Sequence, residues 1–118
     1  MKKRDPQTLL SDIRHHAELG IRIAATATRD QFLADEPMQL ALTRVIEVIG
    51  EAAGRLDQDT KNRLSDVPWH EIIAMRHILA HAYDILDLDR LWETAMDDLP
   101  KLVEVTAAEI TRLDEVNT

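Results

Sequence analysis

The chain has 118 residues, which indicates a single domain spanning residues 1–118, and its 45% apolar composition is enough for a core. It contains no cysteine, which excludes disulfides, thiolate zinc sites and thiol nucleophiles, and its three glycines and four prolines are too few for a turn-rich sandwich or barrel. The formal charge of −8, from 14 Lys and Arg against 22 Asp and Glu, argues against a broad basic face for nucleic acid.

The first residues resemble the start of a signal peptide, but the pattern stops at once. Met1 to Arg4 are followed by Asp5, Pro6 and Gln7, where an apolar segment should stand. The longest strictly apolar run, residues 72–75, has four residues and is far too short to span a membrane. We therefore expect a cytoplasmic protein without a membrane segment.

Two long helices are expected in the first half of the chain. The first begins at Asp5–Pro6, a capping residue followed by proline, and its stripe consists of Leu9, Ile13, His16, Gly20, Ile23 and Ala27. The second begins at residues 35–37 with the same signal, and its stripe consists of Met38, Leu42, Val45, Ile46, Ile49, Ala53 and Leu56. Gly50 interrupts good helix formers at a cost of about 1 kcal/mol, which favours a close approach by a neighbouring helix.

The second half predicts a short helical turn at residues 58–65 and two further helices. One opens at residues 66–69, runs to about Tyr83 and is apolar around much of its circumference, so it should contact neighbours on several sides. The last continues to about Asp114 and should kink at Pro100. Residues 84–118 carry a net charge of −7, typical of a solvated helix face. The fold class is therefore all-α: an antiparallel bundle of four long helices plus a short helical turn.

The residues best suited to chemistry stand together near the end of the third long helix. They are Arg76, His77, His81 and Tyr83. On an ideal helix Arg76 and Tyr83 lie about 20° apart, whereas Arg76 and His81 lie about 140° apart. One copy cannot easily aim Arg76 and His81 at a single atom, but two copies related by a two-fold axis can form a shared cleft.

This combination of side chains suits the cleavage of phosphodiester bonds. Histidine exchanges protons near neutral pH, so it can accept a proton from a ribose 2′-hydroxyl or donate one to the leaving oxygen. The planar guanidinium of arginine binds phosphate oxygens in pairs and stabilises the charge that builds on them. Neither role requires a metal ion or another cofactor.

Structural explanations for the same residues stay open at this stage. Arg76 and His81 could belong to a buried ion pair or to a helix cap, and a charged His81 near a helix C-terminus is favoured by the helix dipole. His77 and His81, four residues apart, could hold a metal ion. However, His70–Glu71 lacks the second histidine of an H-E-x-x-H motif, and no nearby carboxylate completes the ligand set.

The run from Arg76 to Tyr83 reads R-x-x-x-x-H-x-Y, which resembles the signature of HEPN-domain ribonucleases. Three further segments resemble the HepT branch of that superfamily: residues 44–53, Pro68–Trp69 at the start of a helix, and residues 98–100 in the last helix. The resemblance covers roughly residues 5–113, nearly the whole chain.

The resemblance implies a two-fold homodimer that acts as the toxin of a type VII toxin–antitoxin pair and cleaves RNA without metal. Arg76 and His81 match the catalytic pair. His77 stands where relatives commonly have asparagine, and we expect it to support the pair through a hydrogen bond to RNA or to His81. Tyr83 matches the tyrosine that a MntA-like minimal nucleotidyltransferase antitoxin modifies with AMP, which adds bulk and negative charge at the mouth of the cleft.

The charge of −8 motivates an alternative of a different class. A non-catalytic HEPN dimer that binds nucleotide, RNA or a nucleotidyltransferase partner would also fit the sequence. If the chain does act on RNA, its acidic residues should lie away from the cleft or meet a basic antitoxin. The sequence predicts no DNA or membrane partner.

Overall fold

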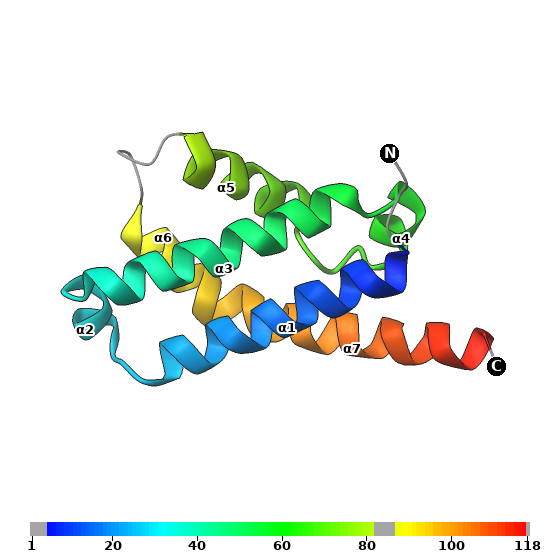
Figure 1. Cartoon of the computed structure of the whole chain (residues 1–118), viewed down its shortest axis with the longest axis horizontal. Coiled ribbons are helices and arrows are strands. Elements are labelled where there is room, and N and C mark those ends of the chain that lie inside the picture. The colour runs from blue at the N-terminus through cyan, green and yellow to red at the C-terminus, as the bar shows by residue number, and fades with distance from the viewer. Residues whose placement is uncertain (1–4, 82–86, 118) are drawn as a thin grey trace.

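The computed structural model describes residues 5–81 and 87–117, and no strand occurs among them (Figure 1). Its elements in chain order are α1 (Pro6–Ala25), α2 (Arg29–Leu33), α3 (Glu36–Arg55), α4 (Gln58–Arg63), α5 (Trp69–His81), α6 (Leu88–Glu93), the π-helical turn η2 (Thr94–Asp98) and α7 (Leu99–Val116). This confirms the all-α class. None of the described helices is long and apolar enough to cross a membrane.

The helices pack in a simple order that leaves α5 at one edge. α1 contacts α7 on one side and α3 on the other, and α5 lies on the far side of α3 (Figure 1). Side chains from α1, α3 and α7 fill the centre, among them the almost fully buried Leu10, Ile13, Leu42, Ile46, Ile49, Leu99 and Leu102. The aliphatic stripes predicted for these helices therefore meet in one core.

Short-range side-chain caps set most helix starts. The Asp35 carboxylate accepts a hydrogen bond from the backbone N–H of Met38 at 3.1 Å, and Asp87 does the same for Arg90 at 3.1 Å. Asp57 accepts bonds from both the N–H and the hydroxyl of Thr60, at 3.1 and 2.6 Å. Each cap satisfies a donor that the first helical turn leaves without a partner.

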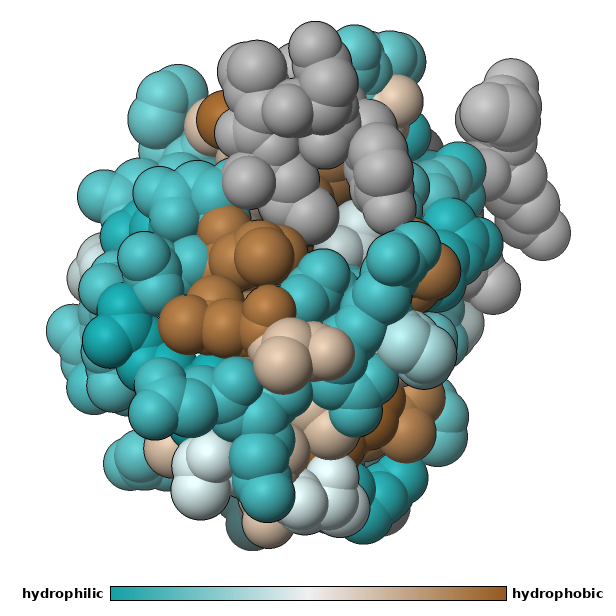
Figure 2. Space-filling model, turned by 90° about the vertical axis from the view of Figure 1, so that its left-hand side faces the viewer, coloured by the Kyte–Doolittle hydropathy of each residue, from teal (hydrophilic) through white to brown (hydrophobic). Residues whose placement is uncertain are grey.

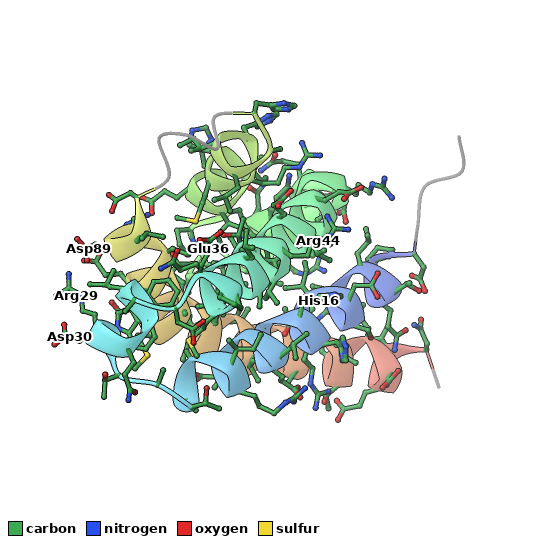
Figure 3. The ribbon with its side chains drawn as sticks, turned by 60° about the vertical axis from the view of Figure 1, so that its left-hand side comes forward. His16, Arg29, Asp30, Glu36, Arg44 and Asp89 are labelled. Atoms are coloured by element: carbon green, nitrogen blue, oxygen red, sulfur yellow. The ribbon has the colours of Figure 1, made fainter. Side chains whose placement is uncertain are left out.

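Two boundaries differ from the sequence prediction. The first helix ends at Ala25 rather than continuing through Ala27, because Thr28 and Gln31 form a reciprocal capping box that starts the separate helix α2. An ion pair between Arg29 and Asp89 joins α2 to α6 (Figure 3). The stripe that predicted one helix therefore crosses a helix break.

The expected kink near Pro100 takes the form of a wider helical turn. Pro100 has no backbone N–H and its ring crowds the preceding turn, so a regular α-helix cannot continue unchanged. In η2 the N–H of Leu99 donates to the carbonyl of Thr94, five residues earlier. The single long helix predicted here is consequently divided into α6, η2 and α7.

A buried carboxylate fastens α4 to α7. Glu109 accepts hydrogen bonds from Arg112 at 2.8 and 2.9 Å and from Arg63 at 2.6 Å, and its side chain is 4% exposed. The bond from Arg112 and then the bond from Arg63 lower the pKa of Glu109 to about 2, although burial acts in the opposite direction. The prediction of a fully solvated acidic face is therefore wrong at this residue.

Replacing Glu109 by glutamine should destabilise the fold. The substitution removes charge-assisted hydrogen bonds, and we expect a loss of about 1–3 kcal/mol in the free energy of unfolding at pH 7. Because the pKa of folded Glu109 is about 2, against an ordinary 4.5, its stabilising effect is complete above pH 4.5 and disappears as the pH falls towards 2. Thermal melts of the two proteins across this range measure the difference.

Glu104→Gln provides the matched control, because Glu104 is exposed on the same helix. That variant should melt close to the wild type at pH 7. A Glu109→Gln protein that also melts like the wild type at pH 7 would contradict the stabilising role of Glu109.

Candidate active site

The helix α5 carries three of the four predicted site residues, Arg76, His77 and His81, and only part of its apolar surface is covered. Trp69, Ile72 and Leu79 are buried, whereas Ala74 and Ile78 are exposed, Ile78 by 46%. Its main packing partner is α3. The expectation of a central helix with neighbours on several sides is therefore wrong for this single chain, and α5 lies at its edge (Figure 1).

Gly50 of α3 lies directly against the turn of α5 that bears Arg76. An ideal Cβ placed on Gly50 would stand 2.3 Å from the Cβ and 2.9 Å from the Cγ of Arg76, and 3.2 Å from the carbonyl oxygen of Ile72. Carbon atoms in ordinary contact lie about 3.5–4.0 Å apart. The close approach that the sequence predicted at Gly50 is confirmed, and it occurs beneath a predicted site residue.

The guanidinium of Arg76 has no partner among the residues that the structure describes. Arg76 is half-buried, and no hydrogen bond or ion pair joins it to any residue within 5–81 or 87–117. Its first side-chain carbons lie against α3, so the stem is held while the charged group stays available. The buried ion pair that the sequence left open is absent from this part of the chain.

The two histidines stand at the C-terminal end of α5. Both His77 and His81 are exposed, and their rings stack at a centroid distance of 6.1 Å with an interplanar angle of 28°. His81 is the last described residue of α5. Two imidazoles are thus presented to solvent beside each other.

One chain brings His77 and His81 together but does not join Arg76 to His81. Arg76 packs against α3, whereas His81 is exposed five residues later, and no hydrogen bond connects their side chains. Tyr83 lies outside the described residues, so its placement stays a prediction.

A shallow groove of about 360 Å³ runs between α5 and α6. It is mostly apolar, and it is lined by Glu71, Ala74, Met75, Ile78, Leu79, Asp87, Arg90 and Leu91. Figure 2, which views the end of the molecule from the side of α2 and α6, shows apolar side chains gathered on this face within a hydrophilic surround. Uncovered apolar surface of this kind is typical of an interaction site.

Arg90 and Asp98 are polar residues of this region that the sequence interpretation did not single out. Arg90 pairs with Glu71 at 3.3 Å, which ties α6 to α5. Burial raises the pKa of Asp98, while the nearby charge of Arg90 acts to lower it. Asp98 lies in the segment 98–100, one of those that resemble the HepT branch. This resemblance is the feature of the sequence that could have pointed to Asp98.

Other histidine and carboxylate residues do not add to the site. His16 lies on α1, with α3 between it and α5 (Figure 3), and its Nδ1 lies 2.9 Å from the carbonyl oxygen of Asp12. Among residues 5–81 and 87–117, no group of three or more His, Asp or Glu side chains is arranged to hold a metal ion.

Fold and site together define an all-helical protein that presents an arginine and two histidines from an edge helix. The chain belongs to the Ribonuclease HepT-like family, whose model matches residues 13–109. This confirms the resemblance noted in the sequence.

Two curated relatives are similar over nine-tenths or more of their length. "Probable ribonuclease HepT" of Thermococcus cleftensis is 36% identical, over 85% of this chain and 91% of that protein. "Putative RNase MJ1380" of Methanocaldococcus jannaschii is 32% identical, over 86% of this chain and 94% of that protein. No solved structure matches the chain.

Arg76→Gln tests whether the guanidinium serves the fold. Glutamine keeps the Cβ and Cγ atoms that pack against Gly50, and the charged group it removes has no partner in the described chain. We expect the free energy of unfolding to change by less than about 0.5 kcal/mol. Urea or thermal unfolding followed by circular dichroism measures it.

The comparison variant is Arg63→Gln, which removes a 2.6 Å ion pair with buried Glu109 and should be measurably less stable. If Arg76→Gln instead loses as much stability as Arg63→Gln, then Arg76 is a structural residue.

Proposed function

We propose that this protein is a metal-independent endoribonuclease whose active site combines Arg76 and His81 from two copies of the chain. The observation that carries the proposal is the arginine itself: its stem is fixed against α3, and its guanidinium has no partner in the described chain. A cation that no described residue pairs with, on an edge helix and five residues before an exposed histidine, is suited to an external phosphate. Membership of the Ribonuclease HepT-like family supports RNA as the substrate.

The proposed reaction is an internal transesterification. His81 accepts the proton of a ribose 2′-hydroxyl as that oxygen attacks phosphorus, and the bond from phosphorus to the 5′-oxygen breaks. The departing oxygen takes a proton from the imidazolium of the partner copy's histidine or from water, leaving a 2′,3′-cyclic phosphate. Arg76 binds the phosphate oxygens whose negative charge increases in the transition state.

The need for two copies follows from the geometry of α5. Arg76 faces α3 while His81 points to solvent, so a two-fold axis beside the helix supplies the missing histidine from the second chain. The uncovered apolar residues of α5 support such an arrangement, because Ala74 and Ile78 would be buried in a dimer. The homodimer is part of this proposal.

His77 is proposed as a supporting residue. It stacks on His81 at a centroid distance of 6.1 Å, so it can limit the orientations of that ring or donate a hydrogen bond to RNA. Its position beside Arg76 in the sequence places it at the same turn as the proposed phosphate site.

The partner proposed for regulation is a MntA-like minimal nucleotidyltransferase, the antitoxin of a type VII pair. It would transfer AMP to the hydroxyl of Tyr83, two residues after His81 in the sequence. An added phosphodiester brings one negative charge and a nucleotide's bulk close to the site, which opposes RNA binding. The net charge of −8 gives the unmodified protein no long-range electrostatic attraction for RNA, so binding must depend on local contacts.

RNA cleavage by the wild-type protein and by His81→Ala tests the proposed reaction. The wild type should cleave RNA in the presence of EDTA, and the variant should be at least about 100-fold slower, because it lacks the group that transfers the proton. Gel electrophoresis of end-labelled RNA measures both rates and detects the cyclic phosphate.

His70→Ala is the matched control, because His70 is exposed at the other end of the same helix and has no proposed role. It should cleave like the wild type. Cleavage that survives in both Arg76→Ala and His81→Ala would refute the residue assignment. Tight RNA binding without turnover by the wild type would favour the non-catalytic dimer.

The proposed modification of Tyr83 predicts a mass change. Co-expression with a MntA-like minimal nucleotidyltransferase should add whole units of AMP and suppress RNA cleavage, and Tyr83→Phe should prevent both effects. Intact-mass spectrometry measures the addition. If the mass still increases in Tyr83→Phe, another residue is the acceptor; inhibition without a mass change would indicate occlusion of the site.

A further inference from the structure

The three glycines of the chain differ sharply in what surrounds them. A Cβ on Gly54 would meet no atom within 4 Å. A Cβ on Gly20 would meet Leu99 Cδ1 at 2.5 Å and Val45 Cγ1 at 3.2 Å, both at the ends of side chains. Only the Cβ on Gly50 would meet atoms fixed to the backbone of another helix, the Cβ of Arg76 at 2.3 Å and the carbonyl oxygen of Ile72 at 3.2 Å.

The atoms facing Gly50 cannot move aside independently. The Cβ of Arg76 is bonded to the α5 backbone, and the Ile72 carbonyl lies in the same turn, so neither yields by a change of side-chain rotamer. Restoring an ordinary contact of about 3.5–4.0 Å from a separation of 2.3 Å would require α5 to shift by about 1.2–1.7 Å relative to α3. A methyl group at position 50 therefore displaces the helix segment that carries the proposed phosphate-binding arginine.

We infer that Gly50 is a positioning residue for Arg76, an inference that rests on the proposed function. Its missing side chain lets the Arg76 stem lie on the α3 backbone, which fixes the first two carbons of that side chain. The guanidinium then meets a phosphate from a nearly preset position instead of being ordered upon binding. Gly50 itself touches neither RNA nor a reacting atom.

The size of the effect follows from how steeply reaction rates depend on geometry. Displacements of about 1 Å at a catalytic group reduce rates by about 100-fold. Gly50→Ala should therefore cleave RNA about 100-fold more slowly than the wild type while keeping its helical circular dichroism spectrum. The introduced alanine favours helix formation, so a loss of activity cannot be attributed to weaker helix propensity.

Two alanine substitutions of the same kind serve as controls. Gly54→Ala lies one turn along α3 in open space, so it should keep wild-type activity and melt at the same or a higher temperature. Gly20→Ala crowds the flexible end of Leu99 in the core, so it should lower the melting temperature while leaving the activity of the folded protein close to that of the wild type. Size-exclusion chromatography checks that every variant keeps the wild-type oligomeric state.

A double-mutant cycle on RNA affinity separates positioning from general damage. The dissociation constant of a 2′-O-methyl RNA, which cannot be cleaved, is measured for the wild type, Gly50→Ala, Arg76→Ala and the double variant. If Gly50 acts through Arg76, Gly50→Ala weakens binding in the wild type but adds no further loss in the Arg76→Ala protein. If Gly50→Ala weakens RNA binding by the same factor in the Arg76→Ala protein as in the wild type, the inference is wrong.

The activities of the single variants distinguish a failure of the proposed function from a failure of the inference about Gly50. If Arg76→Ala cleaves RNA like the wild type, the proposed function fails; if Arg76→Ala is inactive while Gly50→Ala behaves like Gly54→Ala, only the present inference fails. Should Gly50→Ala not fold, the variant Gly50→Ala with Arg76→Gly removes the clashing Cβ, and it should melt at the same temperature as Arg76→Gly alone or higher, because alanine favours the helix. A double variant that stays unfolded would overturn the role of this contact.

Discussion

The close approach of α3 and α5 at Gly50 and Arg76 is the contact on which the geometry of the site depends. It places the backbone of one helix directly against the side-chain stem of the other, because Gly50 carries no side chain. The rest of the bundle, where α1 lies between α3 and α7, holds α3 in place. The position of Arg76 therefore depends mainly on how α5 packs against α3.

Charge is distributed so that the acidic composition does not abolish this site. Part of the negative charge is used structurally: Glu109 is buried between two arginines, Asp89 pairs with Arg29, and Glu71 pairs with Arg90. The Arg76 guanidinium has no such partner in the described chain, so its charge is not neutralised locally. An overall charge of −8 is therefore compatible with one local cation that is free to bind phosphate.

The sequence predicts this molecule well wherever the deciding interactions are local. Caps such as Asp35 act over three residues, so the start of α3 is readable directly from the chain. The break before α2 is missed, because a stripe of apolar residues continues across it. The kink at Pro100 is predicted, but not the π-helical form that it takes. The link between Arg63 and Glu109 spans 46 residues, and no local pattern encodes such a pair.

Because α5 lies at the edge of the bundle, we expect the helix that carries the site to be less stable than the rest of the fold. It buries three of its thirteen residues, whereas α3 buries eight of twenty, so less burial holds α5 to the protein. Segments with few buried contacts open at a lower free energy cost than global unfolding. We therefore expect α5 to open at a lower free energy cost than α1, α3 and α7, so that warming disrupts the arginine-bearing surface before the rest of the bundle melts.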